Sequence, residues 1–263
     1  MPQPASRARI RSARRLLRRK ERRLAGAFLA EGPQAVREAL RRPGRVLELF
    51  VTAAAAERHA DLVAAHPEPR LIDEAELRAL TDAVTPQGVV AVCRTDPHDA
   101  DSVITADTRL LVCCARVSDP GNAGTVIRCA DAFGADAVVL SAESVDPYNP
   151  KTVRASVGSL FHLPIAVDAD VTDVVTAARA RGLQVLAADG AGESLTALAG
   201  SGELARPTLW LFGNEAHGLS DELAGLADRV VAVPILGAAE SLNLATAAAV
   251  CLYASSAALN PDA

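Results

Sequence analysis

Side chains suited to catalysis follow two short apolar runs near the end of the chain. The first run, residues 208–212, has the length of a buried parallel strand and is followed by Glu215 in a Gly-Asn-Glu sequence. The second run, 230–233, is followed by a proline, a turn, and then Ser241 and Asn243 at the expected start of a helix. Ligands of open α/β sheets bind beyond the carboxyl ends of the strands. The two strand ends and the helix start are therefore predicted to form one pocket.

A third group of polar residues lies in the sequence SDPGNAGTVIR, residues 118–128. Its glycines precede a predicted helix that runs to residue 133, and the N–H groups at a helix N-terminus can hold an anion. Asn122 and Arg128 are six residues apart, so in a helix they would lie on different turns and could border the same loop. The glycine spacing differs from G-x-G-x-x-G, which argues against a nucleotide-dependent oxidoreductase.

Four stretches together resemble the SpoU/TrmH family of RNA ribose 2'-O-methyltransferases. They are residues 119–134, residues 156–164 (SVGSLFHLP), FGNEAHGL from residue 212, and VPILG with ESLNLATAAAV between residues 233 and 250. They occur in family order and at family spacing. Near the N-terminus, AGAFLAEGPQAVREAL resembles the substrate-binding domain that often precedes this family's catalytic domain. The resemblance implies an α/β fold: a small N-terminal RNA-binding domain and a C-terminal parallel-sheet domain with a trefoil knot.

The resemblance also implies that S-adenosylmethionine is the methyl donor, and it places roles on particular residues. The implied cofactor-binding residues are Gly213, Asn214, Gly218, Ile235, Leu236 and Leu242. The implied catalytic residues are Asn122, Arg128, Glu215, Ser241 and Asn243. No metal is expected, because His217 has no second His or Cys suitably placed.

Arg128 is implied to assist deprotonation of the ribose hydroxyl. A guanidinium has a pKa above ~12, so it is a poor base. We expect Arg128 to bind an RNA phosphate and to stabilise the developing 2'-alkoxide, with a structural ion pair to a buried carboxylate as the alternative. Glu215 is at least as suited to linking two loops of the knot as to catalysis, and Ser241 is equally suited to capping a helix.

Basic residues are concentrated at the N-terminus of an otherwise acidic chain. Residues 1–23 contain ten arginines and lysines and one glutamate, whereas the whole chain has a net charge of −5. Such a cluster favours polyphosphate backbones. The residues expected to contact RNA are Arg11, Arg14, Arg15, Arg18 and, from the second half of the chain, Arg154. A solvated basic helix or a transit peptide is the alternative for the N-terminal run.

Composition bounds the remaining possibilities. With 263 residues, of which 50% are hydrophobic, the chain can form one large domain or two ordinary ones. It shows no secretory signal and no apolar run of the ~18 residues that span a membrane. Its five cysteines include no C-x-x-C pair, which favours reduced thiols in a cytoplasmic protein over zinc or disulfides.

Hydrophobic periodicity, read with the resemblance, predicts two domains. Residues 1–97 should form the RNA substrate-binding domain, beginning with a basic helix over 7–24, and residues 98–108 a polar linker. Residues 109–263 should form the knotted methyltransferase domain, with a strand over 110–117 and a last helix capped by Glu240 or Ser241.

The resulting prediction is an S-adenosylmethionine-dependent RNA 2'-O-ribose methyltransferase, with 23S ribosomal RNA as the expected substrate. Transfer RNA is the alternative substrate, and a non-catalytic RNA-binding protein of the same fold is the alternative class. The resemblance further implies a homodimer formed through the knotted domain. No membrane partner is expected.

Overall fold

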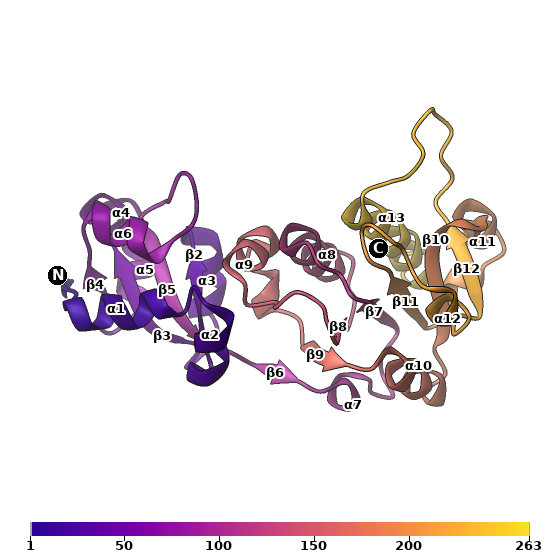
Figure 1. Ribbon diagram of the computed structural model, residues 1–263, viewed down its shortest axis with the longest axis horizontal. Helices are drawn as coiled ribbons and strands as arrows, with labels where there is room; N and C mark the ends of the chain where they lie inside the picture. The colour runs from indigo at the N-terminus through magenta and orange to yellow at the C-terminus, as the bar shows by residue number, and fades with distance from the viewer. Residues whose placement is uncertain (1, 263) are drawn as a thin grey trace. The chain divides into compact units, whose positions relative to one another are not determined.

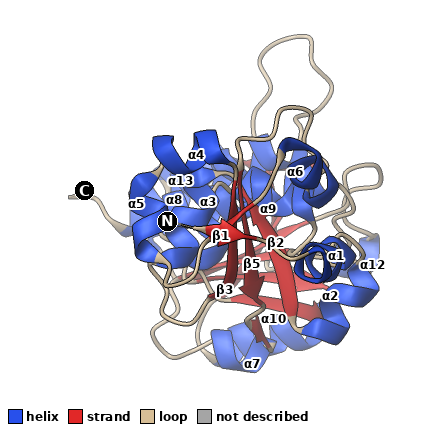
Figure 2. Ribbon diagram, turned by 90° about the vertical axis from the view of Figure 1, so that its left-hand side faces the viewer, coloured by secondary structure: helices blue, strands red, loops and turns tan. Residues whose placement is uncertain are grey.

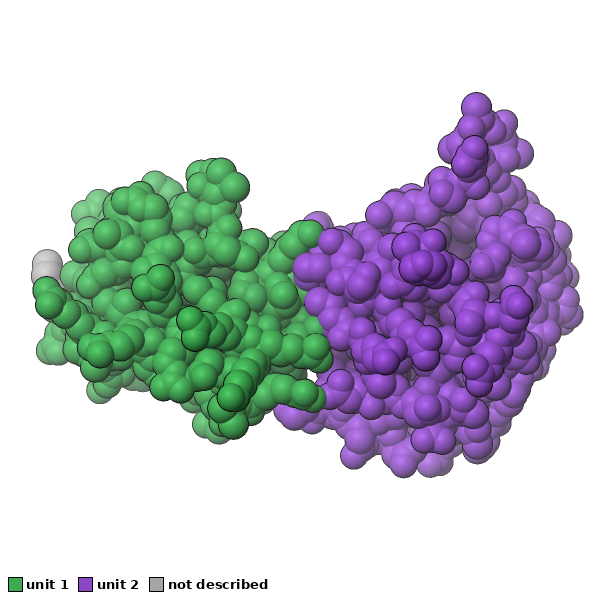
Figure 3. All heavy atoms as spheres, in the orientation of Figure 1, with its two compact units in different colours: residues 1–96, 146–162 green, residues 97–145, 163–263 purple. Residues whose placement is uncertain are grey.

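The computed structural model describes residues 2–262, which pack as two compact units (Figure 3). Unit 1 consists of Met1–Asp96 and Asp146–His162, and unit 2 of Pro97–Val145 and Leu163–Ala263. Residues 146–162 therefore pack in unit 1, although they lie in sequence within the predicted methyltransferase domain. The domain boundaries at 97 and 109 stay a prediction.

Unit 1 is built on a five-stranded mixed sheet in the order β1-β4-β3-β5-β2. Its strands are β1 (Gln3–Pro4), β2 (Ala27–Glu31), β3 (Val46–Val51), β4 (Arg70–Leu71) and β5 (Val89–Arg94). Helices α3 (Pro33–Leu40), α4 (Ala53–Arg58) and α5 (Ala60–Ala65) lie on one side of the sheet (Figure 2). Helices α1 (Arg7–Arg15), α2 (Arg19–Ala25) and α6 (Glu74–Leu80) lie on the other. From the inserted segment, α9 (Pro150–Ser156) contacts β2 and the short helix η1 (Ser159–Phe161) contacts α3.

The predicted basic helix over residues 7–24 is wrong in one respect, because the chain forms two helices there. Arg22 accounts for the break. Its buried guanidinium donates hydrogen bonds to the backbone oxygens of Leu16 and Leu17 at 3.0 and 2.9 Å, which the break leaves free. The same guanidinium pairs with Asp146 at 2.6 Å. A long-range ion pair thus fixes the turn between the two basic helices.

Unit 2 contains a seven-stranded sheet in the order β12-β10-β11-β7-β8-β9-β6, with every neighbouring pair parallel. The strands are β6 (Pro97–His98), β7 (Leu110–Cys114), β8 (Ala137–Ser141), β9 (Ile165–Ala169), β10 (Gln184–Ser194), β11 (Thr208–Phe212) and β12 (Arg229–Ala232). One face is covered by α7 (Ala100–Val103), α10 (Val171–Ala180) and α12 (Asp221–Ala224) (Figure 1). The other is covered by α8 (Pro120–Ala132), α11 (Leu195–Gly200), η2 (Glu203–Ala205) and α13 (Leu244–Leu259). The predicted parallel sheet is present, and the trefoil knot stays a prediction.

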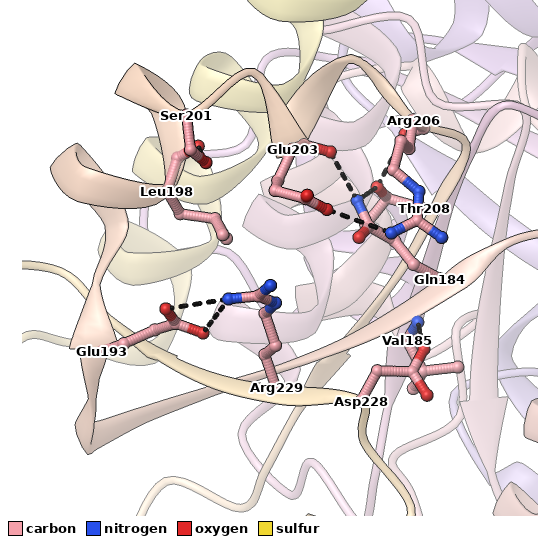
Figure 4. A network of polar contacts seen from close by, with 10 residues as sticks. All are labelled: Gln184, Val185, Glu193, Leu198, Ser201, Glu203, Arg206, Thr208, Asp228 and Arg229. Carbon is pink, nitrogen blue, oxygen red and sulfur yellow. Dashed lines mark hydrogen bonds and ion pairs between the residues drawn. The ribbon is translucent and has the colours of Figure 1, made fainter.

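Strand order reverses between β7 and β11, two neighbours from distant parts of the chain. Loops that leave such a point diverge and create a crevice at the carboxyl ends of the strands. Near the amino ends of β10, β11 and β12, polar side chains link neighbouring strands by hydrogen bonds (Figure 4). Gln184 Nε2 donates to Thr208 Oγ1 at 2.9 Å, and Asp228 Oδ2 accepts from the Val185 N–H at 2.7 Å.

Several predicted element boundaries in unit 2 need correction. The glycine-rich stretch is helical from Pro120, because Asp119 caps the helix by accepting from the Asn122 N–H at 2.8 Å. The cap of α13 is Asn243, not Glu240 or Ser241. The predicted linker contains α7 and the last residue of β6, His98, and the strand expected over 110–117 ends at residue 114.

The cysteines and the helices bear on redox state and membrane contact. All five cysteines are free, and burial raises the pKa of the Cys113 and Cys251 thiols to about 12.

Between residues 2 and 262, no helix combines the length and apolar character that crossing a membrane requires.

Candidate functional site

A cavity of about 580 Å³ lies where β11 and β12 end and where β10 has its register shift after Ala188. It is lined by residues 188–190, 212–216, 218, 231–235, 239–242, 244 and 247. This volume falls within the range of roughly 300–1,000 Å³ typical of small-ligand pockets. Five of the six predicted cofactor-binding residues line it: Gly213, Asn214, Gly218, Ile235 and Leu242. The sixth, Leu236, does not, because it is 98% exposed on the loop that extends from unit 2 between β12 and α13 (gold in Figure 1).

The Gly-Asn-Glu motif forms a tight hairpin at the end of β11. Asn214 and Gly218 exchange two backbone hydrogen bonds, at 2.9 and 2.8 Å. A Cβ on Gly213 would lie 2.2 Å from the carbonyl carbon of Gly218, so only glycine fits there. Gly218 has a φ of +65°, which also favours glycine. The Asn214 side chain donates to the Arg116 backbone oxygen at 2.8 Å, which joins the hairpin to the loop after β7.

Glu215 joins the same two loops more extensively. Its carboxylate accepts from the N–H groups of Ser118 and Asp119 at 3.1 and 3.0 Å, and from Asn122 Nδ2 at 3.2 Å. The first two donors precede α8, where the helix dipole favours a negative charge. Burial alone would raise the pKa of the Glu215 carboxyl, but these hydrogen bonds hold the pKa below its ordinary value. Glu215 is therefore an ionised link between two strand ends.

Asn243 extends this link to the last helix. Its Nδ2 donates to Asn122 Oδ1 at 3.0 Å, while its own Oδ1 accepts from the N–H groups of Ala245 and Thr246 and caps α13. Three predicted catalytic residues, Asn122, Glu215 and Asn243, thus form a continuous hydrogen-bonded chain. A fourth, Ser241, is exposed and lines the cavity.

Arg128, the fifth predicted catalytic residue, lies apart from this chain. It is on α8, about 9 Å along the helix axis from Asn122, and does not line the cavity. Its side chain is exposed and makes no hydrogen bond or ion pair with any residue between 2 and 262. The alternative of a structural ion pair thus finds no support in the described chain, and the cation is available to a ligand.

The predicted RNA-contacting arginines fall into two groups. Arg11, Arg14 and Arg18 are exposed. Arg15, in contrast, pairs with Glu21. Arg154 is held by two carboxylates of unit 1, Glu31 and Asp82, and its side chain is only 29% exposed. Arg15 and Arg154 thus have partners within unit 1, and their contact with RNA stays a prediction.

Sequence reasoning missed the part of the cavity formed by β10. Asp189 and Gly190 line the cavity, and Asp189 Oδ1 accepts from the Ala191 N–H at 3.0 Å. The signal was available, because Asp-Gly follows an apolar run, and the regular pairing of β10 with β11 stops at Ala188, directly before these two residues. The titratable side chains among the lining residues are the carboxylates Asp189, Glu215 and Glu240. Within residues 2–262, no cluster of three or more His, Cys, Asp or Glu side chains is placed to hold a metal ion.

Comparisons with known proteins agree with this geometry. A sequence profile of the SpoU rRNA Methylase family matches residues 109–253, more than half of the chain, and a profile of the MRM3-like substrate binding domain matches residues 7–91. The chain is 34% identical to the 23S rRNA (guanosine(2553)-2'-O)-methyltransferase RlmP of Bacillus subtilis, over 95% of this chain and 96% of that protein.

Two crystal structures share the fold over almost the whole chain. One is the SpoU methyltransferase AviRb from Streptomyces viridochromogenes in complex with the cofactor AdoMet, with a TM-score of 0.82 and 33% identity over 95% of this chain and 97% of that one. The other is an AdoMet-bound rRNA methyltransferase from Sinorhizobium meliloti, with a TM-score of 0.79 and 32% identity over 96% of this chain and 95% of that one. These likenesses confirm the predicted α/β fold class.

Proposed function

The chain belongs to the SpoU rRNA methylase family, and we propose that it transfers a methyl group from S-adenosylmethionine to a ribose 2'-hydroxyl of 23S ribosomal RNA. The observation that carries the proposal is the cavity at the carboxyl ends of β11 and β12 and beside the middle of β10, bordered by the chain Asn122–Glu215–Asn243. Transfer RNA is the second candidate substrate. The N-terminal unit, which matches a substrate-binding domain, would hold the RNA.

The residues of the cavity fit S-adenosylmethionine. This cofactor carries a sulfonium and an ammonium against one carboxylate, so it is a net cation. The ionisable side chains of the cavity are acidic, and Phe212, Val231 and Ile235 supply apolar wall. Backbone groups at Gly213, Ile235 and Leu242 would hold the adenine and methionine parts. When bound, the cofactor supplies an electrophilic methyl group.

The remaining tasks fall to side chains of this chain. The ribose must be oriented in line with the methyl group, and its hydroxyl must lose a proton. We assign orientation to Asn122, Asn243 and Ser241, whose amide and hydroxyl groups lie in or beside the cavity. Arg128 would bind an RNA phosphate and stabilise the developing alkoxide, because a guanidinium remains charged at neutral pH. Glu215 would act as a positioning residue, since its hydrogen-bond acceptors already hold the loop after β7.

A homodimer is part of the proposal. Helix α13 is largely apolar, yet it exposes Val250 (37%) and Tyr253 (62%). An apolar helix of this kind is normally covered on all sides. Tyr253 packs against Phe133, next to α8, with ring centroids 5.7 Å apart, so the two helices present one surface. A second copy of the chain would cover it, and Arg128 of α8 would then serve RNA bound at the other copy's cavity.

We also propose a cytoplasmic location. Its support is the free and largely buried state of the five cysteines, which is usual where thiols are kept reduced. Cell fractionation with an antibody to the chain tests this location, and recovery from a membrane or extracellular fraction would contradict it.

The first experiment measures methyl transfer directly. Purified protein is incubated with methyl-labelled S-adenosylmethionine and unmodified 23S ribosomal RNA or transfer RNA, and the RNA is digested to nucleosides. We expect labelled 2'-O-methylnucleoside from 23S RNA. Arg128→Ala should lower the rate about 10²- to 10³-fold, the range for loss of one charge-stabilising group. Arg181→Ala, an exposed arginine elsewhere in unit 2, is the matched control and should retain the rate.

Each other outcome has a meaning. If only transfer RNA became labelled, transfer RNA and not 23S ribosomal RNA would be the substrate. Absence of label, with no binding of S-adenosylmethionine by calorimetry, would leave a non-catalytic RNA-binding protein of the same fold. Equal loss in the two arginine variants would remove Arg128 from the site.

A further inference from the structure

The fold itself uses some of the arginines of α1 and α2. Arg9 Nη1 lies 3.0 Å from Glu48 Oε2 of β3, and Arg15 pairs with Glu21. Arg22 is buried in the ion pair that fixes the turn between the helices. These cations have partners within unit 1 and need no ligand to account for them.

Three other arginines of α1 have no such partner. Arg7, Arg11 and Arg14, here called the arginine row, are exposed and make no hydrogen bond or ion pair with the part of the chain that the structure describes. Their spacings of four and three residues place them on one side of the helix. Like charges at these spacings repel one another. The arginine row therefore lowers the stability of α1, and the stability of the fold does not explain why these arginines are present.

A neighbouring side of α1 is already occupied. Ile10 and Ala13 are buried in the core of unit 1 with Leu77 and Leu80 of α6. The exposed residues of α1 are arginine, alanine and serine. A helix that lies on a membrane, or in the apolar groove of a partner, needs a free apolar side. The exposed surface of α1 has no large apolar side chain and is rich in positive charge, which suits a polyanion.

We propose that the arginine row binds successive phosphates of one RNA strand that runs along α1. This inference rests on the proposed function, which makes RNA the substrate. Arg7 and Arg14 are about 10 Å apart along the helix axis, and a nucleic-acid strand carries a phosphate about every 3.4 Å of its axis. Guanidinium groups bind phosphate through two parallel hydrogen bonds. Phosphates are alike in every nucleotide, so the arginine row holds and aligns the RNA without selecting its sequence.

A matched pair of variants tests the proposal in the full-length protein. Arg11→Ala/Arg14→Ala removes two members of the arginine row. Arg9→Ala/Arg15→Ala removes the same charge from the same helix, but from side chains that already have partners. The dissociation constant for a 23S RNA transcript, and for random-sequence RNA of equal length, is measured as the salt concentration rises.

Each phosphate contact contributes about 0.7 to 0.9 to the slope of log K against log salt. We therefore expect the first variant to lose about 1.4 to 1.8 from this slope with both RNAs, and the second to keep the wild-type slope. An unchanged slope in the first variant, or equal losses in the two, would overturn the proposal. So would a first variant that loses binding to phosphatidylserine vesicles while RNA binding persists, since the ligand would then be a membrane.

Methyl transfer, measured on the same samples at saturating RNA, separates this proposal from the proposed function. A wild-type protein that shows the expected slopes but transfers no methyl group would contradict the proposed function alone. Normal transfer with unaltered slopes in the first variant would contradict the arginine row alone.

Discussion

At the scale of single residues, Glu215 organises the site by accepting hydrogen bonds. Ser118, Asp119 and Asn122 all donate to it, and all three lie 93 or more residues earlier in the chain. An uncharged side chain of the same shape would present an N–H group to at least one of these donors. The ionised state of Glu215 is therefore part of the geometry of the cavity wall.

Glu215→Gln should weaken binding of S-adenosylmethionine by roughly tenfold or more, because the hairpin after β11 loses its anchor to the loop after β7. The expected cost to the free energy of unfolding is about 1 kcal/mol, since the hydrogen bonds are partly exposed. Calorimetric titration and urea denaturation measure the two effects. Unchanged cofactor affinity would show that the link is dispensable.

The pH dependence of the same pair of proteins follows from the sign of the pKa shift. The pKa of folded Glu215 is below its ordinary value of 4.5, so its contribution to stability is complete above that value. It is lost as the pH falls through the pKa of the folded state. Between pH 5 and more acidic solution, wild type should lose more unfolding free energy than Glu215→Gln in urea titrations. Parallel losses would contradict this assignment.

The sequence identifies candidate residues of the site, but it does not show which of them come into contact. Motif order predicted that Gly213 and Leu242 would share a pocket, and both line the cavity. The bond from Asn243 to Asn122 spans 121 residues, and no local pattern predicts it. Leu236 looks like pocket wall from its apolar type alone, yet it lies on a projecting loop. The type of a residue makes it a candidate for the pocket wall, but only the fold shows whether its side chain faces the cavity or the solvent.

At the scale of elements, apolar runs predicted the strands well, because buried parallel strands have little choice of composition. The run 208–212, for example, is β11. Helix ends were harder to predict where several residues can cap: Ser241 and Asn243 compete, and Asn243 caps. The break after α1 depends on Asp146, 124 residues from Arg22, so helical periodicity cannot reveal it.

The hairpin after β11 should tolerate no side chain at its first residue. In Gly213→Ala, the added Cβ would overlap the backbone of Gly218, so residues 213–218 must move. We expect a loss of about 1–3 kcal/mol in unfolding free energy, as for other overpacked sites, and loss of cofactor binding. Gly237→Ala is the control, because nothing lies within 4 Å of a Cβ there. Chemical denaturation measures the unfolding free energy of both variants, and calorimetry measures their cofactor binding. Equal stability and equal binding in the two variants would contradict the predicted overlap at residue 213.

At the scale of the whole molecule, the exposed apolar residues of α13 predict self-association. Val250→Asp places a charge in the proposed dimer surface and should shift the protein to monomer in sedimentation velocity, with loss of methyl transfer. Val84→Asp alters a fully exposed valine of unit 1 and should leave the mass unchanged. A monomeric wild type, or a dimeric Val250→Asp, would contradict the proposed surface.

The segment 146–162 has a consequence for how the chain is made. Phe28, fully buried in unit 1, stacks on Phe161 and contacts Tyr148, with ring centroids 5.9 and 4.8 Å apart. A nascent chain cannot complete this aromatic cluster until residue 161 has left the ribosome, by which time β7 and β8 have already been synthesised. Domains usually mature one after another during translation. Here unit 1 cannot finish folding until residues 146–162 have been synthesised, so the folding of the two units overlaps in time.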